Sequence, residues 1–224
     1  MIPLRDDAPR FSAPAITWFL VVLNVVVFLF EISLPPQQRA ELLTTFGVVP
    51  AALAHGGAPW ATLITSMFLH ASWGHVIGNM WFLVIFGDNV EDYLGHFRYL
   101  IFYFVCGIAA SGLQILFDPH STVPGVGASG AIAGVLGAYF ALYPSARVLM
   151  FFPIFFMFWL PAWVVLGYWF VVQFLSGAAT SIAQASSTVN SGGIAFWAHV
   201  GGFAAGLVLA KVLPTRHTRF RLQH

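Results

Sequence analysis

Six long runs of apolar residues divide this chain, and they constrain its fold more than any other feature. A membrane-spanning helix needs about 20 mostly apolar residues. The runs that reach or approach this length are Ala15–Leu34, Ser72–Gly87, Phe97–Phe117, Ser129–Tyr143, Val148–Ser176 and Ile194–Leu213. Only 8% of the residues are charged, whereas about 25% are charged in a typical water-soluble domain. We therefore expect an all-α membrane protein built as a bundle of six transmembrane helices.

The basic residues predict the direction of these helices. If the N-terminus is cytoplasmic, eight of the nine Lys and Arg residues fall on the cytoplasmic side, and only Arg39 falls outside. The eight are Arg5, Arg10, Arg98, Arg147, Lys211, Arg216, Arg219 and Arg221. We expect one polytopic membrane domain over residues 1–224, with a core at about 13–213 and short cytoplasmic tails. The basic C-terminal tail is expected to bind anionic lipid.

Three further segments carry expectations of their own. The outer connection Pro35–Leu69 is expected to be partly helical, and the uncharged connection Gly177–Gly193 is expected to form a flexible cap. Pro153 and Pro161 predict a kink in the fifth span.

The single Cys106 excludes an internal disulfide, and the net charge of +1 argues against a nucleic-acid partner.

Polar residues stand out inside the apolar runs. His75 and Asn79 lie four residues apart in the second run, so they share one helix face. Ser129 begins the fourth run, and His199 lies in the sixth. Because a polar side chain is costly in lipid, these four residues are candidates for a functional site.

The expected topology places these side chains at one level. The second, fourth and sixth runs all pass from outside to inside. At about 1.5 Å of rise per residue, His199 and Ser129 lie roughly 8 Å below the outer surface, and Asn79 lies roughly 10 Å below it. The non-helical segment before Ser129 must then enter the membrane, which is tolerated where the backbone lines a watered cavity.

Small residues predict which helices touch. Ser129, Ala133 and Gly137 recur every fourth residue, as do Gly202, Gly206 and Ala210 after His199. Such stripes let helix backbones approach closely. Their contact brings the Ser129 hydroxyl within reach of the His199 imidazole.

A serine beside a neutral imidazole can act as a nucleophile, because the imidazole removes the hydroxyl proton. The backbone N–H of Ser129 and the side chains of Asn79 and His75 are candidate donors to an oxyanion. No Asp or Glu lies within the core of a span, so a Ser–His dyad is favoured over a full triad.

At these residues the chain resembles the rhomboid family of intramembrane serine proteases. The resemblance rests on His70-x4-His75-x3-Asn79, on Gly-Ala-Ser129-Gly and on Ala-His199-x2-Gly202-x3-Gly206, each in the matching span, and it covers nearly the whole chain. It implies a six-helix rhomboid-like bundle, a Ser129–His199 dyad, and an oxyanion site formed by His75, Asn79 and the Ser129 backbone.

The resemblance also implies a function. Substrates would be single-span membrane proteins in a lipid bilayer, and neither a cofactor nor a metal is implied. We expect a bacterial plasma membrane, with the active site opening to its outer side. Two positions depart from the family pattern: Ala61 follows Trp60 where an arginine is common, and Ala133 replaces an aromatic residue that packs on the catalytic histidine.

Other interpretations are possible for each residue. Ser129 alone could be a helix N-cap, His199 alone could bond to a neighbouring helix, and Asn79 could join two helices. His70 is expected at the rim, where it would stabilise a loop. The alternative for the whole chain is a non-catalytic rhomboid-like protein that binds client transmembrane helices.

Overall fold

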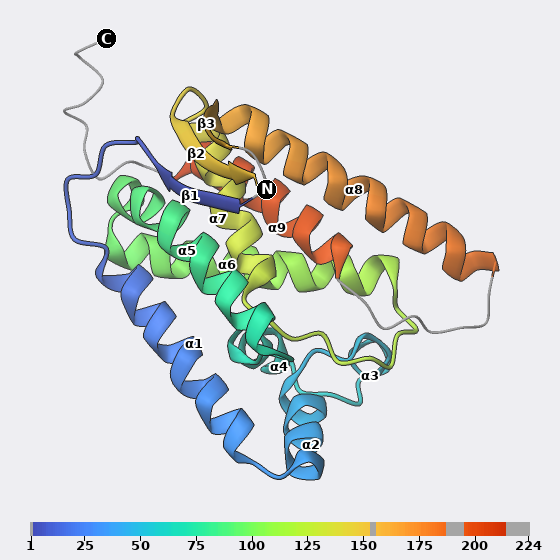
Figure 1. Cartoon of the computed structure of the whole chain (residues 1–224). Helices are drawn as coiled ribbons and strands as arrows, with labels where there is room; N and C mark the ends of the chain where they lie inside the picture. Colours follow the sequence, from blue (N-terminus) through green and yellow to red (C-terminus); the bar gives the residue numbers. More distant parts are fainter. Residues whose placement is uncertain (1, 153–155, 187–194, 214–224) are drawn as a thin grey trace.

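The computed structural model describes residues 2–152, 156–186 and 195–213. This part of the chain is mostly helical, with one small sheet (Figure 1). The helices are α1 (Ala15–Ser33), α2 (Pro36–Phe46), α3 (Pro50–Ala54), α4 (Thr62–Thr65), the 3-10 helix η1 (Ser66–Phe68), α5 (Trp73–Leu94), α6 (His96–Phe117), α7 (Ser129–Leu142), α8 (Ala162–Ser186) and α9 (Phe196–Val212). The strands are β1 (Ile2–Asp6), β2 (Arg147–Phe152) and β3 (Phe156–Pro161).

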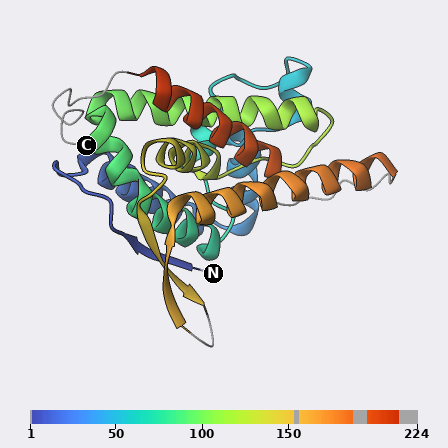
Figure 2. The same ribbon diagram turned by 90° about the horizontal axis from the view of Figure 1, so that it is seen from above.

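Helix α7 forms the centre of the bundle, enclosed by the other helices (Figure 2). Every residue from 131 to 139 is buried. Its 14 residues rise only about 21 Å, less than the roughly 30 Å of the hydrocarbon core. Because neighbouring helices cover it, α7 can be short without exposing its ends to lipid.

Helices α7 and α9 touch backbone to backbone. A Cβ atom on Gly202 would overlap the carbonyl oxygen of Gly130, and one on Gly206 would overlap that of Gly134. The contact predicted from Gly202 and Gly206 is therefore present. On α7, Gly137 and Ala133 of the predicted stripe lie at this contact, and the backbone also approaches closely at Gly130 and Gly134, which the prediction did not include.

The fifth apolar run does not form one kinked span, and the prediction of a purely α-helical protein was wrong here. Val148 lies in β2, which pairs with β3 as an antiparallel hairpin, and the helix begins only at Ala162. Strand β1 adds to β2 on its other side, so the N-terminal segment belongs to a three-stranded sheet in the order β1-β2-β3. A run of Phe, Ile, Val and Met suits a strand as well as a buried helix, and Pro161 cannot lie inside a helix without breaking it.

The far end of α8 also differs from expectation. The helix continues through Ser186, so the first part of the expected flexible cap is helical. Residues 187–194 of that cap and the basic tail from 214 onward lie outside the described residues. The outer connection after α1 contains α2, α3, α4 and η1, and its expected helical content is confirmed.

Three described helices, α1, α6 and α8, are long and apolar enough to cross a membrane, and α7 and α9 are shorter apolar helices. Helix α5 has the length of a span but carries Asp88, Glu91 and Asp92 near its end. The Glu91 carboxylate accepts hydrogen bonds from the backbone N–H groups of Ile16 and Thr17, at 2.9 and 2.8 Å. The acidic end of α5 therefore holds the start of α1, and six spans remain a prediction.

Candidate active site

Ser129 and His199 face each other across the contact between α7 and α9. Ser129 is the first residue of α7, and His199 lies near the start of α9. The distance from His199 Nε2 to Ser129 Oγ is 2.9 Å. The glycine contacts described above allow this approach, because side chains between the helices would hold the two backbones apart. His199 is buried, with 9% of its surface exposed.

Helix α8 holds the other side of the imidazole. Gln173 Oε1 lies 2.7 Å from His199 Nδ1, and a carbonyl oxygen can only accept a hydrogen bond. The imidazole proton therefore sits on Nδ1, which leaves Nε2 free to accept the Ser129 hydroxyl proton. The Trp169 ring packs against the same imidazole, with ring centroids 5.7 Å apart. Gln173 and Trp169 thus hold the imidazole from the side of α8.

His75 and Asn79 lie beside the loop that leads into Ser129. Gly127 has a φ of +124°, a conformation that favours glycine. A Cβ atom there would lie 2.6 Å from the His75 ring and 3.5 Å from Asn79 Nδ2. The glycine therefore lets both side chains pack directly against the backbone two residues before Ser129.

His70 belongs to this cluster, although the sequence placed it at the rim. It is fully buried, and its Nε2 lies 2.9 Å from Asn79 Nδ2. Because an amide nitrogen donates, His70 Nε2 accepts this bond and orients the Asn79 side chain. The His70 backbone N–H in turn donates to the buried Glu31 carboxylate at the end of α1, at 3.1 Å.

An arginine from a different part of the outer connection supports this turn. Arg39 of α2 donates from Nη2 to the carbonyl oxygens of His70 and Ala71, at 3.2 and 2.9 Å. Its guanidinium also lies over the Phe28 ring, 5.9 Å from the centroid. Arg39 thus gives the outer connection a cationic contact, although position 61 carries alanine and not arginine.

The loop before α7 is fixed to the outer connection. The Gly127 N–H donates to the Ser66 carbonyl oxygen at 2.9 Å, and Val48 and Gly125 exchange two backbone hydrogen bonds. Ser129 begins a helix, so its own N–H has no acceptor within that helix. A free N–H at a helix N-terminus attracts negative charge, as a donor to an oxyanion must.

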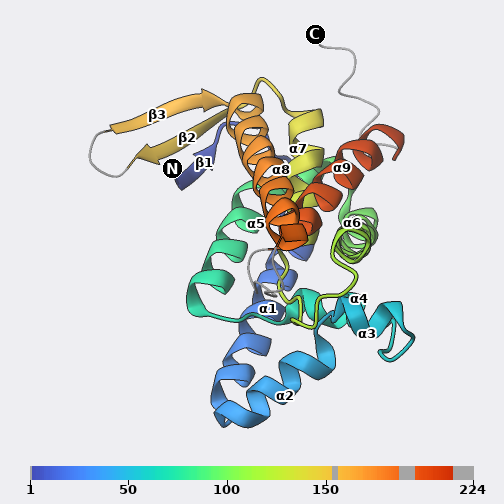
Figure 3. The ribbon, with the colours of Figure 1, turned by 90° about the vertical axis from the view of Figure 1, so that its right-hand side faces the viewer.

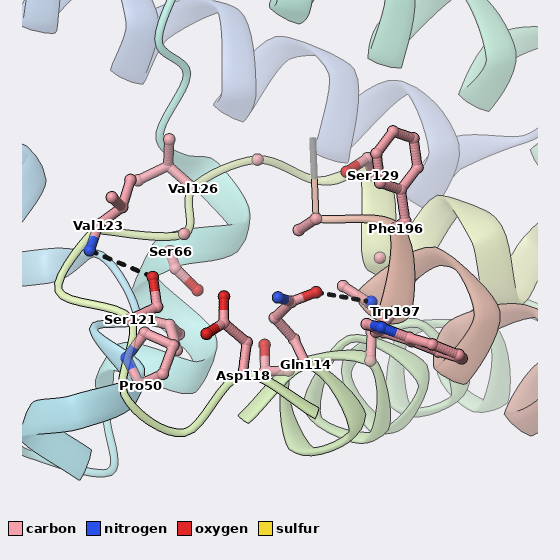
Figure 4. A pocket seen from close by; sticks show the side chains of 18 of the residues that line it. Pro50, Ser66, Gln114, Asp118, Ser121, Val123, Val126, Ser129, Phe196 and Trp197 are labelled. Carbon is pink, nitrogen blue, oxygen red and sulfur yellow. Dashed lines mark hydrogen bonds between the residues drawn. The ribbon is translucent and has the colours of Figure 1, made fainter. Parts of the chain in front are cut away.

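A cavity of about 320 Å³ opens beside Ser129. Its lining includes Ser129, Gly127 and Gly130, but not His75, Asn79 or His199. Figure 4 shows Asp118 and Gln114 reaching into this space from the end of α6. At about 30 Å³ per molecule, the cavity holds roughly ten waters. Ser129 therefore lies at the edge of a space that can hold water.

The four candidate residues predicted from the sequence thus lie in one region, and Gln173, Trp169 and His70 join them. The sequence contained a signal for Gln173, because it is the only glutamine in the apolar run that precedes the uncharged connection. The rule that a polar residue inside a span is functional applies to it as it does to Asn79. The neighbour that Gln173 faces depends on the rotation of α8, and the predicted span began at Val148 whereas α8 begins at Ala162.

Comparisons with known proteins agree with this arrangement. The rhomboid domain family matches residues 57–216. The chain is 29% identical over 215 residues to Rhomboid-like protein 11, chloroplastic, of Arabidopsis thaliana, covering 92% of this chain and 67% of that protein. It is 34% identical over 135 residues to Rhomboid protease GluP of Bacillus subtilis, covering 60% of this chain and 26% of GluP. It is 34% identical over 146 residues to Rhomboid protease AarA of Providencia stuartii, covering 58% of this chain and 52% of AarA.

The chain thus spans about a quarter of the length of GluP and about half of AarA. The family match and the long apolar helices make it a multi-pass integral membrane protein. The matched region contains both sides of the Ser129–His199 contact and covers well over half of the sequence. The chain therefore belongs to the rhomboid family.

Proposed function

We propose that this chain is an intramembrane serine endopeptidase that cleaves transmembrane segments of single-span membrane proteins. The observation that carries the proposal is the 2.9 Å contact between His199 Nε2 and Ser129 Oγ, with Gln173 on the opposite ring nitrogen. Two of the similar proteins, GluP and AarA, are named rhomboid proteases, which supports the same chemistry here.

The proposed reaction begins when Ser129 Oγ attacks the carbonyl carbon of the scissile peptide and its proton passes to His199 Nε2. The carbonyl oxygen becomes an oxyanion, for which Asn79, His75 and the Ser129 N–H are the proposed donors. The C–N bond then breaks, and the leaving amine takes the proton from Nε2. Water from the cavity then attacks the resulting ester while His199 takes one of its protons. The ester C–O bond breaks, His199 returns the proton to Ser129 Oγ, and the carboxylic acid product leaves.

Gln173 has a distinct part in this scheme. During the reaction His199 becomes an imidazolium, whose two N–H groups both donate. The Gln173 oxygen keeps the Nδ1 proton in place before attack and stabilises the cation after it. Gln173 is a neutral amide, so it fixes the tautomer and ring orientation without the charge that a carboxylate would add.

The proposal extends to the setting of the site. We propose one membrane domain over residues 1–224 with a core at about 13–213, in a bacterial plasma membrane, with both termini cytoplasmic and the cavity opening to the outer side. The positive-inside distribution of basic residues supports this orientation. A substrate would present a segment that leaves its helix easily, since an intact helix hides its peptide carbonyls in hydrogen bonds.

Cleavage by purified protein in lipid vesicles tests the proposal. The substrate is a single-span peptide with a Gly- and Ala-rich segment at its outer end, and a Leu-rich version serves as a comparison. We expect cleavage of the first peptide, strongly reduced cleavage of the second, and none with Ser129→Ala. Ser33→Ala, at an exposed serine whose hydroxyl donates to the Phe30 carbonyl oxygen, should cleave as the unmodified chain does.

The non-catalytic alternative predicts a different outcome. A protein that only binds client helices would retain both peptides on the vesicles without producing fragments, and Ser129→Ala would behave like the unmodified chain. Fragments that persist in Ser129→Ala would also exclude the proposed nucleophile.

A further inference from the structure

The sheet that takes up the first part of the expected fifth span differs in charge between its two faces, because its arginines lie on one of them. Side chains alternate along each strand, and the pairing register sets which residues share a face. Val148, Met150 and Phe152 of β2 share one face with Leu160, Phe158 and Phe156 of β3. This face, here called the apolar face, contains no polar side chain on either strand of the hairpin.

The apolar face begins inside the protein and continues beyond it. Val148 and Met150, near the base of the hairpin, are buried in the helical core, with 0% and 3% of their surface exposed. Phe158 and Phe156, farther along β3, are 48% and 62% exposed. The apolar face, which packs on helices at the base of the hairpin, is therefore exposed farther along the strands and is still apolar there.

The opposite face carries arginines over an indole. Arg5 of β1 and Arg147 of β2 both place their guanidinium groups over the Trp159 ring, at 5.5 and 5.9 Å from the centroid. Arg147 also donates to the Asp7 carboxylate at 2.9 Å. Both arginines are exposed, and a cation over an indole is favourable where one side is wet and the other apolar. Leu149, Phe151 and Met157 share this face with the arginines, and Phe151 and Met157 are 40% and 62% exposed. We call this the arginine face, because it carries the charges that the apolar face of the hairpin lacks.

The position of the hairpin relative to the membrane follows from α8. Strand β3 ends at Pro161 and α8 begins at Ala162, and α8 is one of the helices suited to cross a membrane. Because no loop separates them, the base of the hairpin lies where α8 begins, near one membrane surface. The six residues of β3 extend at most about 20 Å from that point.

The hairpin also lies across the helices, not along them. Figure 2 shows it running across the direction of α8, and Figure 3 shows it projecting sideways from the bundle. The exposed part of the apolar face therefore extends over the region that surrounds α8, whose early residue Trp163 is itself 56% exposed. In a multi-pass membrane protein that region is lipid.

From this arrangement we propose that the β1–β2–β3 sheet is a membrane-surface anchor. Its apolar face rests on the acyl chains of the leaflet at which α8 begins, and its arginine face reaches the lipid phosphates. Trp159 between the two arginines is suited to the headgroup level, where tryptophan is enriched. A surface that buries apolar side chains and presents arginines to phosphates binds bilayers rich in anionic lipid most strongly.

Paired spin labels on adjacent residues test this proposal. In the Cys106→Ala background, which removes the single cysteine, one variant carries a label at Phe158→Cys on the apolar face and the other at Met157→Cys on the arginine face. The full chain is placed in vesicles of phosphatidylcholine and phosphatidylglycerol. Collision with oxygen reports contact with the lipid interior, and collision with a water-soluble nickel chelate reports contact with water.

We expect the oxygen-to-nickel accessibility ratio to be at least fivefold higher at Phe158→Cys than at Met157→Cys. Val172→Cys on the exposed side of α8 and Gln37→Cys on exposed α2 calibrate lipid and water. Equal ratios at the two β3 positions, both near the Gln37→Cys value, would overturn the proposal.

A second copy of the chain is the competing occupant, because β3 lies at an edge of the sheet and an edge strand can pair with another. Pairing of two copies would give dipolar broadening of the Phe158→Cys label that disappears when labelled protein is diluted with unlabelled protein. That result would also overturn the proposal, whereas an undiluted spectrum without broadening, together with the expected ratios, supports the bilayer.

Discussion

After Ser129, Gln173 is the residue on which the proposed chemistry of His199 depends most directly. Its Oε1 is 2.7 Å from Nδ1, and this bond determines which ring nitrogen can act as the base. An imidazole with its proton on Nε2 would donate to Ser129 instead of accepting from it. Packing around the imidazole can hold the ring in position, but a hydrogen-bond acceptor at Nδ1 is needed to keep the proton on that nitrogen.

This role predicts unlike effects of two substitutions of similar size. Gln173→Met removes the acceptor and should lower kcat by about 10- to 1,000-fold with little change in KM, a smaller loss than the roughly 10⁴-fold loss seen when a triad aspartate gives the wrong tautomer. Gln173→Glu keeps an acceptor on Nδ1 and should retain most of the activity. Steady-state cleavage kinetics check both, with Gln37→Met as a distant glutamine control.

A purely structural role for Gln173 predicts another pattern. Met and Glu would then disturb α8 to a similar degree, and both variants would lose activity in parallel with their folding stability. Gln173→Met with unchanged kcat would remove the residue from the mechanism.

At this scale the sequence predicted which polar side chains lie together. Ser129, His199, His75 and Asn79 were found because each is polar within an apolar run, and the topology placed them at one depth. The partners of those groups were not found. Whether a glutamine or a histidine faces a neighbour depends on helix rotation, which a lone polar residue such as Gln173 does not reveal.

Helix packing determines whether the two catalytic candidates can meet. Gly134 and Gly206 bring α7 and α9 into backbone contact, one helical turn or more beyond Ser129 and His199. Helix backbones this close leave no room for a methyl group, so the spacing between the two functional side chains depends on glycine.

The contact predicts a sharp difference between two Gly→Ala substitutions. Gly206→Ala inserts a Cβ atom against the Gly134 carbonyl oxygen. Overpacking of this kind lowers the folding stability by about 1–3 kcal/mol. Because the two helices must separate, we also expect more than a tenfold loss of activity. Gly112→Ala in α6 meets no atom within 4 Å and should be neutral or stabilising by up to about 1 kcal/mol.

Denaturant unfolding in detergent micelles, followed by tryptophan fluorescence, measures the stability of each variant, and peptide cleavage measures the activity. Equal behaviour of the two variants in both measurements would contradict the proposed dependence on close helix packing.

The elements themselves were predictable to different degrees. The long apolar runs located α1, α6, α7 and α9 to within a few residues. The β2–β3 hairpin was missed, because a continuous apolar run does not distinguish a strand from a buried helix. Strand β1 was also missed. It pairs with β2, which lies about 145 residues later in the sequence, as in the Ile2–Phe151 pair. No local sequence pattern indicates so distant a partner.

Across the whole molecule, the N-terminal segment ties the sheet to the helical bundle. Asp6 of β1 accepts a hydrogen bond from the Tyr139 hydroxyl of α7 at 2.7 Å, and Arg10 forms an ion pair with Asp88 of α5 at 2.8 Å. The ion pair gives a partner to Asp88, one of the acidic residues at the end of the otherwise apolar α5. These contacts also make global stability sensitive to pH.

Burial raises the pKa of the Asp6 carboxyl from its ordinary value of 3.8 to about 6, although the Tyr139 hydroxyl opposes the shift. Between these values the unfolded chain loses the proton before the folded chain does, so the contribution of Asp6 to stability falls as pH rises from about 4 to about 6. Above that range its cost is constant.

Asp6→Asn should therefore be more stable than the unmodified chain at pH 7.5, because its neutral amide mimics the protonated carboxyl. The difference in Tm between the two proteins should shrink as the pH falls from about 6 to about 4. Thermal unfolding in micelles at four or five pH values measures this. Parallel Tm curves over the whole range would contradict the assignment.

The proposed reaction depends on Ser129 being made nucleophilic by His199. Reaction with a fluorophosphonate probe, followed by mass spectrometry of the digested protein, tests this most directly. We predict one adduct, on the peptide that contains Ser129, with labelling absent in Ser129→Ala and slowed at least 100-fold in His199→Ala. An adduct on another serine, or an unchanged labelling rate in His199→Ala, would contradict it.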